Sequence, residues 1–424
     1  MKRSAIIILF FIFIQSFCFS QIKQQQHSEV TSTILPGAYQ IHEYLPLLKN
    51  KRVGVFANQT SMVDKIHLVD TLQKLGIKIT KIFGPEHGFR GNADAGENID
   101  SYTDAQTGVT VISLYGNKNK PSAVDLADVD VMLFDIQDVG VRFYTYISSL
   151  EYYIESAIQN NKPLIVLDRP NPNGFYVDGP VLDSAYKSFI GMQPVPVVYG
   201  MTIGEYAKML LGEEWLPWKF IRKQDKKISI GEVLGFEEEK SNFRLIVIKC
   251  KNYTHQSRYV LPVKPSPNLP DMGAIYWYPS ICFFEGTVLS EGRGTLHPFE
   301  VFGHPKLPAN LYAFTPVSNA GAKEPKLKNQ LSYGWNLADS KVSYPTCIQL
   351  KWLLQAYRLF PDKDSFFIIP KSGKATDYFF NKLAGNDILM QQIKSGKTEN
   401  EIKASWQPKL DAFKRIRKKY LLYP

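Results

Sequence analysis

From residue 51 onward the chain alternates short apolar runs with amphipathic stretches. The runs, rich in Val, Ile, Leu and Phe, predict strands at 52–57, 77–83, 109–114, 129–134, 163–167 and 245–248. Helical periodicity lies between them at 68–75, 147–159 and 202–211. Apolar runs that alternate with helices predict a parallel sheet covered on both faces. The fold class is therefore expected to be α/β, with a Rossmann-like doubly wound domain.

The pattern changes in the second half of the chain. Residues 218–244 are charged and weakly periodic, and residues 259–279, rich in proline and aromatic residues, predict a loop. The remainder mixes short strands with helices expected at 348–359 and 399–420. Because 424 residues exceed the usual size of one domain, we expect two. Their predicted ranges are 36–257 for the Rossmann-like N-terminal domain and 258–424 for a smaller C-terminal α+β domain.

The first residues predict export. A basic start, MKR, precedes an apolar stretch over 5–14 and a small-residue cleavage pattern at 18–20, which indicates a signal peptide over 1–20. The apolar stretch is too short for a stable membrane span, and no later segment is apolar enough. The mature protein is expected in the periplasm or the medium. Lipidation at Cys18 is an alternative, which the bulky Phe17 before it disfavours.

Composition and charge narrow the class of protein. Hydrophobic residues make up 44% and charged residues 21%, so a disordered or fibrous chain is excluded. The formal net charge of +10 favours acidic partners such as cell-wall polymers, lipid headgroups or nucleic acid, and export argues against nucleic acid. Cys250, Cys282 and Cys347 show no zinc spacing. They predict either one disulfide bridge or buried free thiols.

Polar residues gather directly after the predicted strands. The clusters are Asn58-Gln59-Thr60, Glu86-His87 with Arg90, Tyr115-Gly116, Asp135 to Tyr144, and Asp168-Arg169 with Asn171. The carboxyl ends of parallel strands lie along one edge of a sheet, where ligands bind at the switch in strand order. Five clusters at one edge therefore predict a functional site there.

Glu86 is the leading candidate for chemistry at this edge. It lies in GPEHGFRG (84–91), whose glycines and proline predict a tight turn that leaves the Glu-His pair uncovered. The structural alternative is an ion pair with Arg90 that holds the loop. His87 is expected to orient a partner by hydrogen bonding, since no second histidine lies at metal-ligand spacing. The sequence predicts no metal site and no cofactor.

The other residues of this edge are candidates for substrate binding. Asp135 and Gln137 alternate along a strand end, so both face the site if the strand continues that far. Asp168 and Arg169 suit an internal ion pair and a substrate contact equally well. The remaining candidates are Arg142, Tyr144 and Asn171.

A second polar cluster lies in the C-terminal part, in FEGTVLSEGRGT (284–295). It contains Glu285, Glu291 and Arg293 among three glycines. Glycine lets the backbone approach a ligand, and arginine binds carboxylate or phosphate in a bidentate manner. The alternative is a glycine-rich turn with a surface salt bridge. Because ligands often bind between domains, this cluster is expected to face the strand-end edge across a cleft.

Several enzyme classes lack their motifs in this chain. VGVFANQT (53–60) has no G-x-G-x-x-G, which disfavours a dinucleotide enzyme, and no P-loop, G-x-S-x-G or H-E-x-x-H sequence occurs. The remaining set of carboxylates, aromatic residues and arginines suits cleavage of a glycosidic bond. One carboxylic acid protonates the leaving oxygen, while a second carboxylate or the substrate itself stabilises the cationic transition state.

Long blocks of the chain resemble the exo-β-N-acetylmuramidase family. They are GPEHGFRG (84–91), FDIQDVGVRFYTY (134–146), LDRPNP (167–172), GP (179–180), PSPNLP (265–270), FEGTVLSEGRGT (284–295) and SWQPKLDAFKRIRKKYLLY (405–423). The resemblance implies a Rossmann-like domain, a smaller C-terminal domain and an active site between them. It implies release of N-acetylmuramic acid (MurNAc) from the non-reducing end of peptidoglycan-derived disaccharides and glycan fragments. It also implies that Glu86 is the catalytic acid, with Glu285 or Glu291 as the second carboxylate.

The implied substrate gives the arginines a role. MurNAc differs from N-acetylglucosamine (GlcNAc) by a lactyl carboxylate, which a selective enzyme must meet with a cation. The candidates for that cation are Arg90, Arg142, Arg169 and Arg293. The 2-acetamido group of the substrate is an alternative internal nucleophile, as in some other hexosaminidases. Two rival functions are an esterase or amidase acting on cell-wall material and a non-catalytic exported sugar-binding protein.

Overall fold

The computed structural model describes residues 33–86, 88–91, 100–116, 118–216, 243–339 and 343–424. The predicted signal peptide, His87 and most of the charged segment 218–244 lie outside these residues. Within them, every helix is too short or too polar to cross a lipid bilayer.

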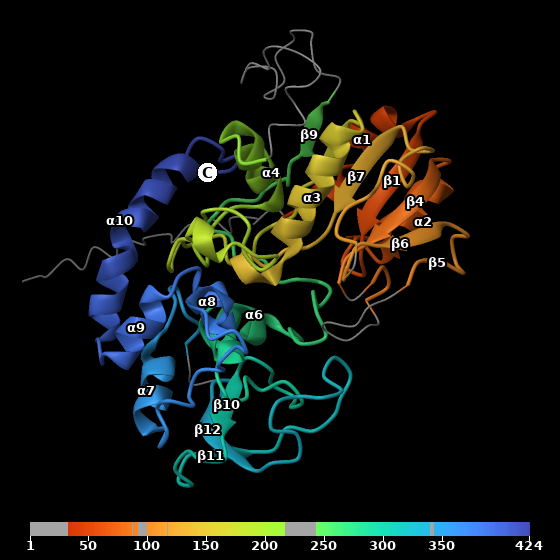
Figure 1. Ribbon diagram of the computed structural model, residues 1–424. Coiled ribbons are helices and arrows are strands. Elements are labelled where there is room, and N and C mark those ends of the chain that lie inside the picture. The colour runs from red at the N-terminus through yellow and green to blue at the C-terminus, as the bar shows by residue number, and fades with distance from the viewer. Residues whose placement is uncertain (1–32, 87, 92–99, 117, 217–242, 340–342) are drawn as a thin grey trace, which may run out of the picture. The chain divides into compact units, whose positions relative to one another are not determined.

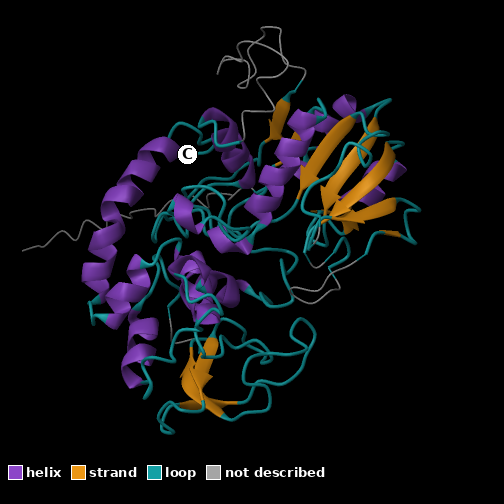
Figure 2. Ribbon diagram, viewed as in Figure 1, coloured by secondary structure: helices purple, strands orange, loops and turns teal. Residues whose placement is uncertain are grey.

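The apolar runs of the first half form a seven-stranded sheet within the described residues (Figure 2). Its strands are β1 (Arg52–Ala57), β4 (Lys78–Gly84), β5 (Tyr102–Thr103), β6 (Thr110–Ser113), β7 (Val131–Asp135), β8 (Leu164–Leu167) and β9 (Leu245–Ile248). Their order is β5-β6-β4-β1-β7-β8-β9, and all neighbours pair in parallel except β5 with β6. Without the β5 edge this is the Rossmann order 3-2-1-4-5-6, so the predicted doubly wound domain is confirmed. A separate hairpin joins β2 (Met62–Val63) to β3 (Ile66–His67).

Helices cover both faces of the sheet because successive strand residues point to opposite sides. The helices are α1 (Ile41–Leu48) and α2 (Leu68–Lys74) on one face, and α3 (Tyr146–Gln159) and α4 (Ile203–Gly212) on the other. Val131 and Leu133 of β7 point into the core under α1 and α2. Met132 and Phe134 of the same strand point into the core under α3 and α4. A strand buried on both faces has no polar side, which is why it appears in the sequence as a continuous apolar run.

The second half forms a smaller domain around an antiparallel three-stranded sheet (Figure 1). Its elements are α6 (Met272–Ile281), the 3-10 helix η5 (Cys282–Gly286), β10 (Val301–His304), β11 (Tyr312–Phe314), β12 (Ser332–Asn336), α7 (Lys351–Leu359), α8 (Phe379–Ala384), α9 (Ile388–Lys394) and α10 (Glu399–Arg417). Their core also contains Val141, Phe143 and Val198 from loops that follow the large sheet. Apolar packing is therefore continuous between the two halves, and the predicted boundary at 257/258 stays a prediction.

The prediction of a loop over 259–279 is wrong for its last third, which belongs to α6. The Asp271 side chain begins this helix by accepting a hydrogen bond from Ala274 N at 2.9 Å. Every residue from Gly273 to Ile281 is buried. A helix buried on all sides has no polar face and so no helical periodicity in its sequence. The internal Pro279 adds a further signal that suggests a loop.

The end of the chain returns to the Rossmann-like domain. Figure 1 shows α10, in blue, leading back towards α4, near which the chain ends. The Tyr423 hydroxyl donates to Asp168 Oδ2 at 2.5 Å and accepts from Cys250 N at 2.8 Å. Leu422 N donates to Glu205 Oε1 at 2.7 Å. Burial raises the pKa of Asp168 to about 7, although the hydrogen bond from Tyr423 opposes this shift. These buried polar contacts attach the last residues to the sheet.

We predict that Tyr423→Phe lowers the free energy of unfolding by about 1–3 kcal/mol, because the buried Asp168 carboxyl and Cys250 N–H each lose a hydrogen-bond partner. Urea unfolding followed by intrinsic fluorescence measures the change. The matched control is Tyr344→Phe, which removes the hydroxyl of an exposed tyrosine and leaves its ring in place. Equal unfolding midpoints for both variants and the unmodified chain would contradict the prediction.

Candidate active site

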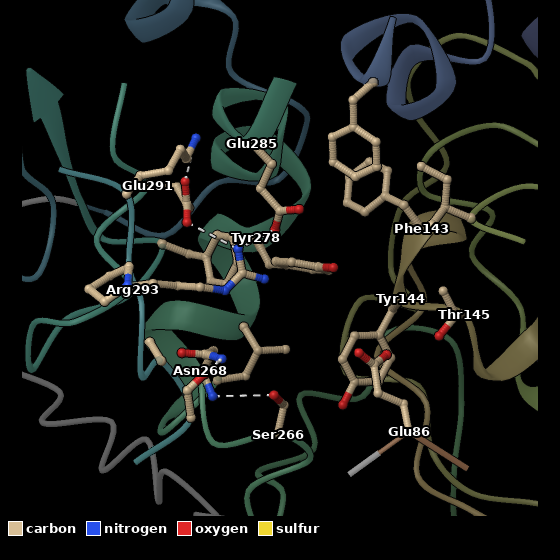
Figure 3. A pocket seen from close by; sticks show the side chains of 18 of the residues that line it. Glu86, Phe143, Tyr144, Thr145, Ser266, Asn268, Tyr278, Glu285, Glu291 and Arg293 are labelled. Atoms are coloured by element: carbon tan, nitrogen blue, oxygen red, sulfur yellow. Dashed lines mark hydrogen bonds and ion pairs between the residues drawn. The ribbon is translucent and has the colours of Figure 1, made fainter. Parts of the chain in front are cut away.

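A pocket of about 690 Å³ is lined by residues that follow β4 and β7 and by residues of the C-terminal half. Figure 3 shows Glu86 and Tyr144 on one side of it, and Glu285, Glu291 and Arg293 on the other. All five were predicted as site residues, and they come from three separate segments of the chain. The structure thus places the leading catalytic candidate and the glycine-rich acidic segment around one space.

A tight turn presents Glu86 to the pocket. Gly88 closes this turn with φ +76° and donates its N–H to Pro85 O at 2.9 Å. Tyr115, which follows β6, lies beside the carboxylate. Burial raises the pKa of Tyr115 well above its usual range, and the charge of Glu86 and a hydrogen bond with it raise it further. The turn and the Tyr115 hydroxyl therefore orient the Glu86 carboxyl group.

An ion-pair network forms the opposite wall. Arg293 Nη1 lies 2.8 Å from Glu285 Oε1 and 3.0 Å from Glu291 Oε1. Lys326 Nζ lies 2.8 Å from Glu291 Oε2. Burial by itself would raise the pKa of Glu291, but the charges of Lys326 and Arg293 outweigh it and hold that pKa below its usual range. Glu291, whose side chain is 2% exposed, is a fixed anion between two cations, whereas Glu285 is 16% exposed.

Lys326 also holds the backbone that carries both carboxylates. Its Nζ donates to the carbonyl oxygens of Phe284, Thr287 and Leu289 at 2.8, 3.2 and 2.6 Å. Because these carbonyls lie on the segment that contains Glu285 and leads to Glu291, the lysine limits its movement. Lys326 was not predicted from the sequence, since it lies in a polar loop with no motif. Only its contacts distinguish it from other lysines.

Aromatic rings connect the two walls. Tyr144 packs edge-on against Tyr146 and Tyr278, with ring centroids 4.9 and 5.9 Å apart. Tyr278 packs on Phe299 at 4.7 Å, and the Arg293 guanidinium lies 4.9 Å from the centre of the Phe299 ring. These rings line the same pocket. Aromatic surfaces of this kind pack on the apolar face of a sugar.

Three predicted binding residues join the strand ends and do not line this pocket. Asp135 and Arg169 form a buried ion pair at 2.6 Å. Gln137 Nε2 donates to Asp138 O at 2.8 Å and to Pro170 O at 2.7 Å. These bonds connect the ends of β7 and β8. The ion partner of Arg169 is therefore Asp135, and its sequence neighbour Asp168 is not.

The other candidates that the structure describes also lie outside the lining of the pocket. Arg90 Nη2 forms an ion pair with Asp104 Oδ2 at 2.9 Å. Arg142 is buried and donates to three backbone carbonyl groups. Asn171 Nδ2 donates to Met201 O at 2.8 Å, and Asp168 holds the end of the chain. His87 lies outside the described residues. Among the described residues, no group of three or more His, Cys, Asp or Glu side chains is placed to hold a metal ion.

Comparison with known proteins gives matches over nearly the whole chain. Residues 53–273 match the family described as "Exo-beta-N-acetylmuramidase NamZ, N-terminal", and residues 276–423 match its C-terminal counterpart. Peptidoglycan beta-N-acetylmuramidase NamZ of Bacillus subtilis (strain 168) is 35% identical over 419 residues, which cover 92% of this chain and 90% of that protein.

Two crystal structures of DUF1343 family proteins from Bacteroides fragilis NCTC 9343 share the fold. One has 44% sequence identity and a TM-score of 0.79, and the other 28% and 0.73. Each match covers 92% of this chain and 99% of the other. The family resemblance inferred from the sequence blocks is thereby confirmed.

We predict that Glu291→Gln lowers the free energy of unfolding by about 3 kcal/mol at pH 7, because it removes the buried carboxylate that Lys326 and Arg293 share and leaves Arg293 with Glu285 alone. The folded state holds the pKa of Glu291 below its usual value. Its stabilisation is therefore present above the unfolded pKa of about 4.3 and is lost as the pH falls below that value.

Urea unfolding at pH 7 and at pH 3 measures this difference, which should shrink in acid. Glu324→Gln is the matched control, since the Glu324 side chain is 81% exposed in its pair with Lys328. A constant difference between Glu291→Gln and the unmodified chain at both pH values would contradict the assignment.

Proposed function

The chain belongs to the exo-beta-N-acetylmuramidase NamZ family, and on that basis we propose that it removes MurNAc from the non-reducing end of peptidoglycan fragments. It is a glycoside hydrolase by this membership. The observation that supports the finer assignment is the shared pocket of Glu86 and the Glu285–Arg293 pair. No comparable match favours an esterase, an amidase or a binding protein among the comparisons above.

Glu86 is proposed as the general acid. In this role its carboxyl group gives a proton to the glycosidic oxygen while the bond from that oxygen to C1 of MurNAc breaks. The tight turn and the hydrogen bond with Tyr115 support the role, because an acid must be held in one orientation towards the leaving oxygen. Water then adds to C1, and its proton passes to the Glu86 carboxylate.

Glu285 is proposed as the second carboxylate in preference to Glu291. Glu291 is committed to two cations and is almost fully buried, whereas Glu285 is the more exposed of the two. A negative charge at this place stabilises the positive charge that develops at C1. The 2-acetamido group of MurNAc is the alternative nucleophile, and Glu285 would then orient that group.

Arg293 is proposed to recognise the lactyl carboxylate of MurNAc. Of the four arginines considered from the sequence, it is the one that lines the pocket. Its Nε is buried and has no hydrogen-bond partner among the described residues, so a donor remains for a ligand. Lys326 balances part of the negative charge of this network through its pair with Glu291. An anionic sugar is therefore favoured over its neutral analogue.

Export is part of the same proposal. Peptidoglycan lies outside the cytoplasm, so the proposed substrate agrees with a signal peptide over 1–20. We propose that the mature enzyme works in the periplasm or the medium.

We predict that Glu86→Gln lowers kcat/KM for the disaccharide MurNAc-GlcNAc by about 10²–10⁴-fold, since a sugar alkoxide leaves poorly without a proton. The loss should be much smaller with 4-nitrophenyl MurNAc, because nitrophenolate leaves without one. Steady-state kinetics on both substrates measures the contrast. Glu43→Gln, which changes an exposed carboxyl on α1, is the matched control. Equal losses on the two substrates would argue against general acid catalysis by Glu86.

We predict that Arg293→Met removes most of the preference for MurNAc over GlcNAc glycosides. The unmodified enzyme should prefer the 4-nitrophenyl MurNAc substrate by about 10²-fold or more, because the GlcNAc analogue leaves the buried Nε–H of Arg293 without an acceptor. The ratio of the two kcat/KM values measures the effect. Arg52→Met, at the start of β1, is the control and should keep the ratio. An unchanged ratio in Arg293→Met would exclude Arg293 as the selecting cation.

A further inference from the structure

The pocket has an apolar rim in addition to its charged wall. Phe189, Ile190 and Phe379 belong to its lining. Phe379 is 37% exposed, and the other two are half-buried. Ligand pockets are lined mainly by apolar and aromatic side chains, with a few polar groups that fix the orientation of the ligand. This rim offers a different chemistry from the Glu285–Arg293 network, so it suits a different portion of the substrate.

The fold places Phe379 next to the carboxylate network. Gly286 directly follows Glu285, and a Cβ there would lie 2.5 Å from the Phe380 Cα. The first turn of α8 therefore packs directly on the backbone beside Glu285. Phe380 anchors this turn in the core, with its ring 4.7 Å from that of Phe367. Phe379, the first residue of α8, consequently borders the charged part of the pocket.

A tight turn presents Phe189 and Ile190. Ser188 and Gly191 close it by two backbone hydrogen bonds, Ser188 N to Gly191 O at 3.0 Å and Gly191 N to Ser188 O at 2.9 Å. The two apolar residues are the tip of this turn. The Phe189 ring lies nearly parallel to that of Tyr152, with centroids 6.2 Å apart and planes inclined by 12°. The Phe189 ring therefore packs on a side chain of α3.

Arg142 joins the two segments that form the rim. Its Nη1 donates to Pro180 O at 2.9 Å and to Val195 O at 2.7 Å, on either side of the turn. Its Nη2 donates to Leu383 O at 2.7 Å, in α8. Among the described residues, no carboxylate forms an ion pair with this buried guanidinium. Burying a charge without a counter-charge costs free energy, and the three hydrogen bonds to carbonyl groups offset this cost. The same hydrogen bonds hold the two segments of the rim in one arrangement.

We propose that Phe189, Ile190 and Phe379 bind the sugar on the leaving-group side of the scissile bond, with Arg142 as their positioning residue. The inference rests on the proposed function. An exo-acting enzyme encloses one terminal sugar, and in the proposed function Arg293 on the other wall binds the lactyl carboxylate of MurNAc. The next sugar, a GlcNAc unit, is neutral and presents an apolar face of C–H groups. Such a face packs on aromatic and aliphatic side chains.

The test compares two substrates that differ only on the leaving-group side. MurNAc-GlcNAc carries the second sugar, and methyl β-MurNAc carries a methyl group in its place. We expect Phe379→Ala and the double variant with Phe189→Ala to lower kcat/KM for the disaccharide about tenfold or more. The methyl glycoside should change less than about threefold, because it makes no contact with the rim. Phe379→Trp should restore most of the disaccharide activity.

Ile369→Ala is the matched control, since Ile369 is 61% exposed and does not line the pocket. Equal losses on both substrates would overturn the inference, because the rim would then affect MurNAc binding or folding. No loss on either substrate would also overturn it, because the rim would then have no role in binding. Failure of the unmodified enzyme to cleave either substrate would overturn the proposed function and the inference together. The two failures are therefore distinguishable from the wild-type rates alone.

Discussion

The free-energy cost of burying charge determines how this molecule is held together around its pocket. Each buried ionised or polar group needs partners, and most of those partners come from distant parts of the chain. The junctions made in this way are Asp135–Arg169 at the strand ends, Arg142 at the rim, Glu291 with Arg293 and Lys326 in the pocket, and Tyr423–Asp168 at the end of the chain. The first three junctions hold segments that carry pocket residues, and the fourth holds the end of the chain.

The pocket combines two chemistries because two parts of the chain meet there. The Rossmann-like domain contributes Glu86 on a turn whose geometry depends on glycine. The smaller domain contributes Glu285 and Arg293. Lys326 holds their segment by hydrogen bonds to its backbone carbonyl groups. A polar contact from Gln59 Nε2 to Pro265 O at 3.0 Å and the continuous apolar core join the two parts. A change in that packing would therefore alter the spacing of the two carboxylates that the proposed reaction uses.

Some of the residues predicted for the site pair with each other, and others face the pocket. Residue type alone does not distinguish these two groups. Asp135 and Arg169 follow strands just as Glu86 does, and all three are of types used in catalysis. In the structure the first two neutralise each other, whereas Glu86 faces the pocket. A strand end must satisfy its own polar groups and also hold its loops, so structural and functional polar residues occur side by side. Sequence patterns locate the edge but do not separate these roles.

The sequence by itself determined the strands of the large sheet and their burial on both faces, because these depend on neighbours within a few residues. It also determined the family, through long blocks of matching residues. Only the tertiary structure decided which cations line the pocket and which aromatic side chains form its rim. The contacts of Lys326 with Leu289 and of Arg142 with Leu383 join residues 37 and 241 positions apart. No local pattern records such pairs, because they form only when the chain folds back on itself.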